Sequence, residues 1–336
     1  MVAQVEQESR LLVSPEEAVA ALNAAHELEA IYEPLKSLAL TPGWIDRKEP
    51  ILRKEPAGAF KPMHWRYREC KSALDVAGRL IDTKLADRRN LVLRNPVENN
   101  NFATTRTLVN AYQMILPGEK ARSHRHSPHA LRVILDAKGA FSVVDGEKTL
   151  METGDVVLTP GWSWHGHGHD GDAPAYWLDG LDVPLTQLLE PMFFEEHPDG
   201  FQDVDVLTED SPMRFTWSSI QKRTEKAAAD NEGYFGKRVR LDAPTMPTIG
   251  IHVERLEAGT KTRRYRHAAN SVFCPMTGSG TSIIGDTSHD WERGDTIAAP
   301  TWHWIEHHAK TDTILFTMSD EFLMQFSHYY RFEGAV

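Results

Sequence analysis

Two stretches of this chain repeat one another at a nearly constant spacing, and no other feature constrains the fold as strongly. The sequence ILPGEKARSHRH, at 115–126, aligns with RLEAGTKTRRYRH, at 255–267. Further along, GDVVLTPGWSWHGH, at 154–167, aligns with GDTIAAPTWHWIEH, at 294–307. The offset between the copies changes by only one residue from the first pair of stretches to the second. Chance does not preserve such a spacing across two motifs, so the sequence predicts two copies of one structural unit.

Both copies contain short apolar segments that are separated by Gly, Asp and Pro turns, as is typical of β-strands. Several short strands at close spacing favour a sandwich or a barrel over a parallel sheet with helices. The sequence therefore predicts an all-β core with one barrel per copy. The segments that carry this prediction are LRVIL at 131–135, GAFSVV at 139–144, DVVLTP at 155–160, AYWLDGL at 175–181 and TILFTM at 313–318.

Helical patterns are found in the N-terminal part of the chain. Ser14, Pro15 and Glu17 form a helix start, with Ser14 as the N-cap and Glu17 closing a capping box. Apolar residues at helical spacing predict a second helix near 74–81. We expect four parts: a helical arm over 1–100, a first barrel over 101–183, an irregular inter-barrel connection over 184–246 and a second barrel over 247–336.

Three histidines of the first copy can share one pocket. His124 and His126 are two residues apart, and such residues on a β-strand point to the same face. A turn at Gly154 and a break at Pro160 bring back a second strand, which carries His165. Three neutral imidazoles on one face, with the other coordination positions open, suit a catalytic divalent metal.

The second copy has lost two of the three equivalent ligands. Tyr265 and Ile305 replace them, and only His267 remains. One histidine does not hold a metal, so we expect no metal in the second barrel and a structural role for it. Its other histidines are expected to be surface residues or hydrogen-bonded core residues: His303, His307 and His308.

Composition argues against two classes of partner. The net charge of −11 and the lack of an evident basic stripe argue against a nucleic-acid partner. We find no apolar run of transmembrane length and no secretory signal, so no membrane partner is expected. Cys70 and Cys274 are too few and too far apart for a disulfide framework, and the cytoplasm is the expected location.

Several motifs together resemble one enzyme family, from about residue 15 to the end of the chain. They are HRHSPHALR at 124–132, VVDGE at 143–147, VLTPGWSWHGHG at 157–168, WLDGLDVPL at 177–185, DRRNLVLRNP at 87–96 and TWHWIEHH at 301–308. The chain resembles the gentisate 1,2-dioxygenase family, which includes salicylate-type and 1-hydroxy-2-naphthoate-type ring-cleaving dioxygenases. The WLDGLD segment is far more specific than the histidines alone.

The resemblance implies a bicupin fold, with two double-stranded β-helix (jelly-roll) barrels, and Fe(II) as the cofactor. It implies extradiol-type cleavage in aromatic hydrocarbon catabolism. Both atoms of O2 are inserted between the carboxyl- and hydroxyl-bearing carbons of a 2-hydroxybenzoate-type acid. It also implies a homotetramer. His124, His126 and His165 match the iron ligands, and Ala130 and Leu131 stand where many metal cupins carry a glutamate, so three histidines are expected to form the site.

The resemblance also assigns catalytic roles. Arg132 matches the residue that anchors the substrate carboxylate, although spacing alone would favour a surface salt bridge. His167, two residues after a ligand, matches an acid or base, and otherwise is a polar lining residue. Asp179 is expected to orient His167 or a ring hydroxyl, or else to be a turn residue. His169 is expected to be solvent-exposed.

Further residues are expected to bind the substrate. Gln113 and Arg88 match residues of the family, although the neighbouring Arg89 makes the second assignment ambiguous. Trp177 shares strand parity with Asp179 and is expected to face the same side. Three positions vary or depart from the usual pattern: Val109 where many relatives carry tryptophan, Asn90 at an often small apolar position, and Ala111 where glycine and alanine alternate. Val109 should enlarge the pocket and Asn90 should add a donor, so gentisate, a substituted salicylate and 1-hydroxy-2-naphthoate all stay open. The competing functions are a metal-dependent isomerase or oxidase, and a non-catalytic storage or ligand-sensing bicupin.

Overall fold

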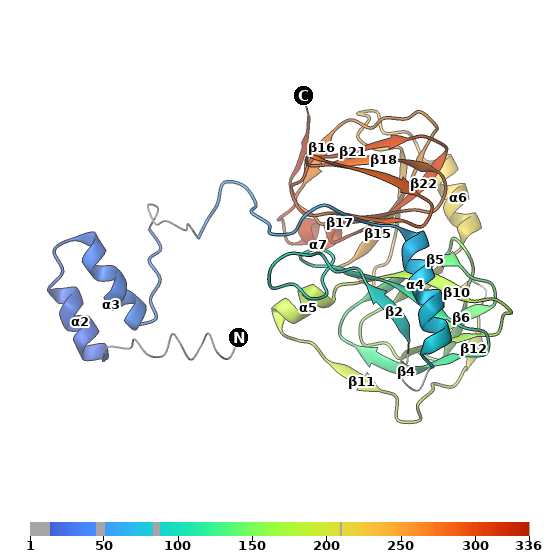
Figure 1. The fold of residues 1–336 in the computed structure, drawn as a ribbon, viewed down its shortest axis with the longest axis horizontal. Helices are drawn as coiled ribbons and strands as arrows, with labels where there is room; N and C mark the ends of the chain where they lie inside the picture. The colour runs from blue at the N-terminus through green and yellow to red at the C-terminus, as the bar shows by residue number, and fades with distance from the viewer. Residues whose placement is uncertain (1–13, 45–50, 83–87, 209, 336) are drawn as a thin grey trace. The chain divides into compact units, whose positions relative to one another are not determined.

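The chain divides into two units, Met1–Ala57 and Gly58–Val336. The computed structural model describes residues 14–44, 51–82, 88–208 and 210–335. Three helices form the described part of the first unit (Figure 1): α2 (Pro15–Asn23), η2 (Leu28–Ile31) and α3 (Tyr32–Ser37). The Ser14 hydroxyl accepts from the Glu17 N–H, and the Glu17 carboxylate accepts from the Ser14 N–H, so the predicted capping box is confirmed.

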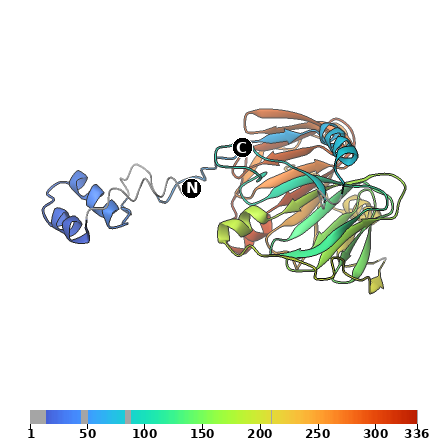
Figure 2. The same ribbon diagram turned by 60° about the horizontal axis from the view of Figure 1, so that its bottom comes forward.

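Two β-barrels lie side by side in the second unit (Figures 1 and 2), which confirms the predicted all-β bicupin core. The first barrel contains β2 (Arg89–Val92), β3 (Val109–Ile115), β4 (Lys120–His126), β5 (Ala130–Asp136), β6 (Ala140–Val144), β7 (Glu147–Met151), β8 (Val156–Thr159), β9 (His165–His169) and β10 (Ala175–Leu181). The second contains β14 (Lys237–Leu241), β15 (Gly250–Leu256), β16 (Tyr265–His267), β17 (Ser271–Pro275), β18 (Ser279–Ile284), β19 (Thr287–Glu292), β20 (Thr296–Ala299), β21 (Ile305–Ala309) and β22 (Thr313–Ser319).

The segments outside these strands are also largely regular. Four helices are α4 (Tyr67–Leu80), which contains most of the helix predicted near 74–81, α5 (Val183–Leu189), α6 (Trp217–Lys226) and α7 (Glu321–Phe326). Five short strands are β1 (Met63–Trp65), β11 (Phe194–Glu196), β12 (Val206–Leu207), β13 (Arg214–Phe215) and β23 (Phe332–Gly334). The segment 184–246, expected to be irregular, therefore supplies strands to both barrels.

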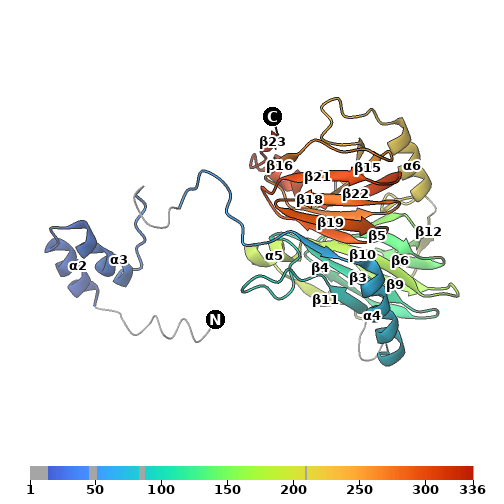
Figure 3. The same cartoon turned by 45° about the horizontal axis from the view of Figure 1, so that its top comes forward.

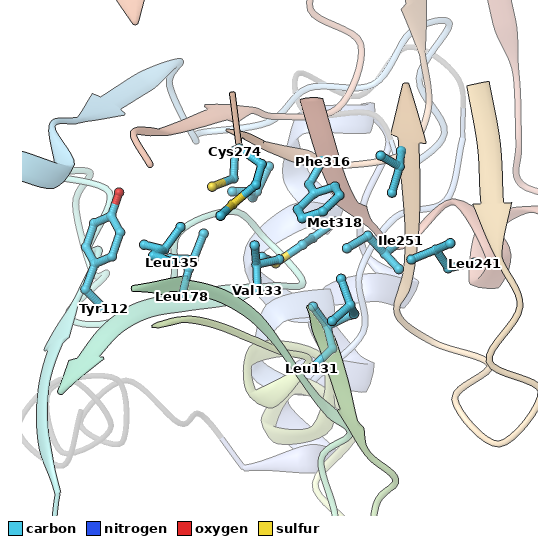
Figure 4. Packing of buried hydrophobic residues seen from close by; sticks show 14 of the residues in the cluster. Tyr112, Leu131, Val133, Leu135, Leu178, Leu241, Ile251, Cys274, Phe316 and Met318 are labelled. Atoms are coloured by element: carbon cyan, nitrogen blue, oxygen red, sulfur yellow. The ribbon is translucent and has the colours of Figure 1, made fainter. Parts of the chain in front are cut away.

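Two sheets, one from each barrel, pack face to face between the barrels (Figure 3). Their strand orders are β13-β8-β5-β10-β3-β2 in the first barrel and β1-β20-β17-β22-β15-β14 in the second. Figure 4 shows Leu131, Val133 and Leu178 of the first sheet against Phe316 and Met318 of the second. The other face of the first sheet lines its own barrel. Because both faces are buried, β3 is buried along its whole length and shows no apolar–polar alternation.

The repeated Gly-Asp turn anchors the start of one helix in each barrel. In the first barrel the Asp155 carboxylate accepts from the Trp217 N–H at 2.8 Å and pairs with Arg214 at 2.6 Å. In the second barrel the Asp295 carboxylate accepts from the Tyr67 N–H at 2.8 Å. The aromatic ring at each helix start lies over the turn glycine, where a Cβ would collide with it at 2.5 to 2.6 Å.

Each barrel also contains one short strand from the segment that precedes the other barrel in sequence. Strand β1 and helix α4 precede the first barrel in sequence, yet β1 pairs with β20 of the second. Strand β13 and helix α6 precede the second barrel, yet β13 pairs with β8 of the first. Helix α4 then packs on β2 and β3, and α6 packs on β14 and β15, so each helix joins both barrels. The structural repeat is therefore longer than the two motifs suggest.

Two further observations concern the described residues as a whole. None of the helices in this part of the chain combines the length and the apolar character needed to cross a bilayer. Cys70, which is partly buried, and Cys274, which is fully buried, are both free thiols.

Replacing Asp155 with alanine should lower the free energy of unfolding by about 3 kcal/mol, because the largely buried Arg214 guanidinium loses its counter-ion. The matched change Asp295→Ala should cost about 2 kcal/mol, because it leaves the buried Tyr67 N–H without an acceptor. Asp170→Ala is the control, since Asp170 is exposed in its pair with Lys148. Urea unfolding followed by tryptophan fluorescence measures all three, and an Asp155→Ala loss no larger than the control's would contradict the anchoring role.

Candidate metal centre

The three predicted ligand histidines converge inside the first barrel. His124 and His126 lie on β4, and His124 is directly opposite His165 on the neighbouring strand β9. A register shift in β4 between Ala121 and His124 precedes the pair. One nitrogen from each ring lies within 4.8 Å of the others. Among the described residues, no other group of three or more His, Cys, Asp or Glu side chains converges in this way.

Hydrogen bonds fix which nitrogen of each ring is free to bind a metal. In each ring Nδ1 lies close to the carbonyl oxygen of a residue two positions away, at 3.1 Å for His124, 2.8 Å for His126 and 3.0 Å for His165. A carbonyl oxygen only accepts, so Nδ1 carries the proton and Nε2 presents a lone pair. The Nε2 atoms of His124 and His165 are buried without a hydrogen-bond partner. This donor set fits a divalent transition metal.

Burial keeps the three imidazoles neutral. It lowers the pKa of His124 to about 3, with a smaller contribution from the positive charge of Arg88. It lowers the pKa of His126 to about 4 and holds the pKa of His165 well below its usual value. A metal entering at neutral pH therefore has no proton to displace from these ligands.

Arg132 and Asp179 form a buried pair on the sheet across the barrel from the ligands. The Arg132 Nη1 donates to the Thr159 hydroxyl at 2.6 Å, and its Nε lies 3.2 Å from Asp179 Oδ1, without hydrogen-bond alignment. The Trp177 indole N–H donates to the same Asp179 oxygen at 3.1 Å. Burial raises the pKa of Asp179 while the charge of Arg132 opposes that rise. Both side chains are buried. The contacts with Thr159 and Asp179 therefore hold the Arg132 guanidinium in place.

His167 is buried in the same barrel without any partner. It is 3% exposed, and neither ring nitrogen has a hydrogen-bond partner. Its ring centre lies 6.2 Å from that of His165 and 5.6 Å from the nearer ring centre of Trp177. Burial, and then the charge of Arg132, hold its pKa well below the usual value. Buried polar groups without partners are rare in proteins, so His167 is placed to meet a ligand.

The expectation that His169 is exposed is wrong. Its side chain is 1% exposed, because β9 continues through this residue. Its Nδ1 accepts from the Gly171 N–H at 3.3 Å, so its Nε2 carries the proton and donates to the Ala173 carbonyl at 2.5 Å. His169 thus has its own hydrogen-bond partners and is not available to the site.

Strand β3 lies beside the Arg132–Asp179 pair in the same sheet. Ala111 lies directly opposite Asp179, and Gln113 lies directly opposite Trp177, so these side chains share one face. Val109 has the same parity on β3 and is 7% exposed. The structure therefore brings the three predicted β3 residues to one buried surface.

The two arginines before β3 differ in position. Arg89 is buried and donates through both terminal nitrogens to Glu119, at 2.6 and 2.7 Å, so it faces away from the barrel interior. Arg88 has the opposite parity, and its charge acts on the pocket histidines. Asn90 lies opposite Gln113 on the edge strand β2, and its side chain is exposed.

Two residues next to the site were not predicted from the sequence. Thr159 contacts Arg132, as described above, and its only sequence signal is its place at the end of a predicted strand. Phe194 of β11 stacks on His124, with ring centres 5.4 Å apart and an interplanar angle of 26°. It lies in the segment interpreted as a connection, where no motif drew attention to it.

The equivalent place in the second barrel is filled with packed side chains. Tyr265 and Ile305 are register partners and are both buried. The Tyr265 ring stacks on Phe332 of β23, with centres 5.7 Å apart. The His267 Nδ1 accepts from a backbone N–H at 3.2 Å, and the buried His307 Nδ1 lies 2.8 Å from a serine hydroxyl. These histidines are part of the packing of the barrel rather than a cluster of free donors.

Comparison with known proteins adds independent information. Residues 111–181 match the Cupin domain family. The chain is 33% identical over 327 residues to gentisate 1,2-dioxygenase 1 of Aquipseudomonas alcaligenes, which covers 89% of this chain and 94% of that protein. It is 30% identical over 336 residues to 5-aminosalicylate 1,2-dioxygenase of Comamonas sp, covering 91% and 90%.

A solved structure agrees with these sequence relatives. A mutant of salicylate 1,2-dioxygenase from Pseudoaminobacter salicylatoxidans, in complex with gentisate, superimposes with a TM-score of 0.83 at 26% identity. The match covers 93% of this chain and 96% of that one, so it includes both barrels.

Proposed function

Because the chain belongs to the family of ring-cleaving dioxygenases that includes gentisate 1,2-dioxygenase, we propose that it uses Fe(II) and O2 to cleave a 2-hydroxybenzoate-type acid. One observation carries the proposal. Three neutral imidazoles each bring one ring nitrogen within 4.8 Å of the others, across the barrel from a buried guanidinium that can bind a carboxylate. The bond cleaved lies between the carboxyl- and hydroxyl-bearing carbons, and both oxygen atoms enter the product.

His124, His126 and His165 would hold the metal. Three protein ligands leave the remaining coordination positions for small molecules, as in other catalytic metal sites. When bound, Fe(II) supplies a redox-active centre at which the aromatic acid and O2 can meet, a chemistry that the redox-inert Zn²⁺ does not offer. The protein contributes fixed ligand tautomers and buried ligand side chains.

Arg132 would bind the substrate carboxylate. Its planar guanidinium can donate two parallel hydrogen bonds to a carboxylate, and Thr159 and Asp179 hold it in one orientation. His167 stays neutral at pH 7, so it has one nitrogen that can accept a proton from the ring hydroxyl and one that can donate. Arg88 and Gln113 would contact the substrate from the β2–β3 side of the pocket.

The relatives and Val109 together indicate the kind of ring substituent. The relatives named above act on gentisate and 5-aminosalicylate, and both acids carry a polar group on the ring. Val109 offers an isopropyl group where many family members carry an indole, so the pocket should have room on the ring side. We therefore propose a substituted or fused-ring 2-hydroxybenzoate as substrate, with gentisate and 1-hydroxy-2-naphthoate as the cases to compare.

The proposal also includes an oligomeric state and a cellular location. We propose a homotetramer, which would cover apolar side chains that stand exposed on one subunit, such as Leu188, Leu189 and Phe193, each more than 60% exposed. We propose the cytoplasm as the location, which suits the free thiols of Cys70 and Cys274. A role in aromatic hydrocarbon catabolism follows from the proposed reaction.

The direct test is oxygen uptake by protein reconstituted with Fe(II), with salicylate, gentisate and 1-hydroxy-2-naphthoate side by side. We expect one iron per chain and consumption of one O2 per ring opened, with no uptake by the Zn²⁺-loaded protein. The double mutant His124→Ala, His165→Ala should lose the iron. Iron without oxygen uptake on any of these acids, or two metals per chain, would contradict the proposal.

Arg132→Lys should lower kcat/KM by at least ~10-fold, because lysine keeps the charge but loses the paired hydrogen bonds, worth roughly 1.4 kcal/mol. Iron content should stay normal, since the side chain is not a metal ligand. Arg68→Lys, on the exposed face of α4, is the matched control. Steady-state oxygen uptake measures the effect, and an unchanged kcat/KM would rule out the carboxylate assignment.

Val109→Trp should suppress turnover of bulky or fused-ring substrates first and spare gentisate, because an indole fills the space beside the substrate ring. The comparison of kcat/KM for gentisate and 1-hydroxy-2-naphthoate, in wild type and variant, measures the change. If the wild type strongly prefers gentisate and the variant slows all substrates equally, Val109 does not set the specificity.

A further inference from the structure

Arg125 lies between the two ligand histidines of β4, and its guanidinium is sandwiched between two tryptophans. Its central carbon is 4.5 Å from the ring centre of Trp162 and 4.4 Å from that of Trp164. Its Nε and Nη2 both donate to one carboxylate oxygen of Glu195 on β11, at 2.8 and 2.6 Å. We refer to these four side chains as the arginine clamp. Strand alternation places Arg125 on the opposite face of β4 from the ligands.

The second barrel contains the same arrangement without a metal site. Arg266 is 4.5 Å from the ring centre of Trp302 and 4.8 Å from that of Trp304. Its Nε and Nη2 donate to Glu333 on β23, at 3.0 and 2.8 Å. Its position in the repeat is that of Arg125, and Glu333 is its register partner, as Glu195 is for Arg125. The clamp is therefore a property of the repeat and does not depend on metal ligands.

In both barrels the clamp holds a short edge strand and the aromatic ring that the strand carries. Strand β11 places Phe194 against His124, and β23 places Phe332 against Tyr265, which occupies the equivalent position. In each barrel the clamp thus holds a phenylalanine ring against the side chain at the first ligand position. In the first barrel that side chain is a metal ligand.

The clamp also fixes the turn that leads to the third ligand. Trp162 has a left-handed backbone, with φ of 67°, and its N–H donates to the His126 carbonyl at 2.7 Å. Trp302 repeats this with φ of 63° and a 2.9 Å bond to the His267 carbonyl. A bulky residue adopts this conformation only where surrounding contacts impose it. Stacking of the tryptophans on the arginine supplies such contacts directly before His165.

We propose that Arg125 is a positioning residue for the metal centre. Through Trp162 and Trp164 it fixes β9 relative to β4, and so sets the distance between His165 and the other two ligands. Through Glu195 it holds Phe194 against His124 and limits the access of water to that ligand. Arg125 is on the face of β4 away from the ligands, so it would act through its neighbours rather than by binding the metal. This inference rests on the proposed function for the identity of the metal, but the clamp itself does not.

The matched variants Arg125→Met and Arg266→Met test this, because they remove the same contacts from the two barrels. The rate at which a chelator removes Fe(II), or Co(II) as a second probe, should rise at least ~10-fold in Arg125→Met. Arg266→Met should lose a similar amount of thermal stability and release metal at the wild-type rate. In metal-free protein, amide hydrogen exchange should speed up at 193–197 in Arg125→Met and at 331–335 in Arg266→Met.

Equal metal release from the two variants, or wild-type release from Arg125→Met, would overturn the proposal and leave the clamp a purely structural feature. If Arg125→Met does not fold, Arg125→Lys serves instead, since lysine keeps the charge but cannot stack as a plane. If the wild type binds neither Fe(II) nor Co(II), the proposed function fails. The exchange comparison in metal-free protein then still decides whether the clamp holds β11 against β4, and unchanged exchange at 193–197 would overturn it.

Discussion

One sheet of the first barrel is buried on both faces, and this burial links the site in the first barrel to the packing of the second. One face carries Arg132 and Asp179 into the barrel, and the other presents Leu131, Val133 and Leu178 to the second barrel. Without that partner the outward face would be a large apolar surface in water. The second barrel is thus a packing requirement of the first. This explains why the second barrel has a complete hydrophobic core although Tyr and Ile occupy two of its three ligand positions.

A comparison of the two barrels distinguishes residues that stabilise the fold from residues that serve the proposed reaction. The Gly-Asp anchors, the exchanged helices and the arginine clamp occur in both barrels. The three imidazoles, the Arg132–Asp179 pair and the unpartnered His167 occur in one. Phe273 takes the place of Arg132 in the repeat. The features present in both barrels therefore serve the fold, and in the first barrel the clamp has the added positioning role proposed above. The features found in one barrel are explained by the proposed reaction.

The fold class and the ligand group could be predicted because both depend on local patterns: turn residues, strand alternation and a repeated spacing. The exchange of β1 onto the second barrel could not, because Asp295, far away in sequence, anchors the start of the following helix α4 there. The contact of Phe194 with His124 was missed for a similar reason. Its repeat partner is Phe332, and a two-residue match is too short to detect. The ambiguity between neighbouring arginines needed three-dimensional contacts, because only the structure shows that the Arg89 side chain donates to Glu119.

We propose that one barrel of the two holds a catalytic iron on three histidines. Anomalous diffraction at the iron absorption edge, from crystals of the Fe(II)-reconstituted protein, can locate this iron. We predict a single strong peak per chain, bonded to the Nε2 atoms of His124, His126 and His165, and no peak in the second barrel. A peak beside His267 or His307, or an empty three-histidine site in fully reconstituted protein, would contradict the account.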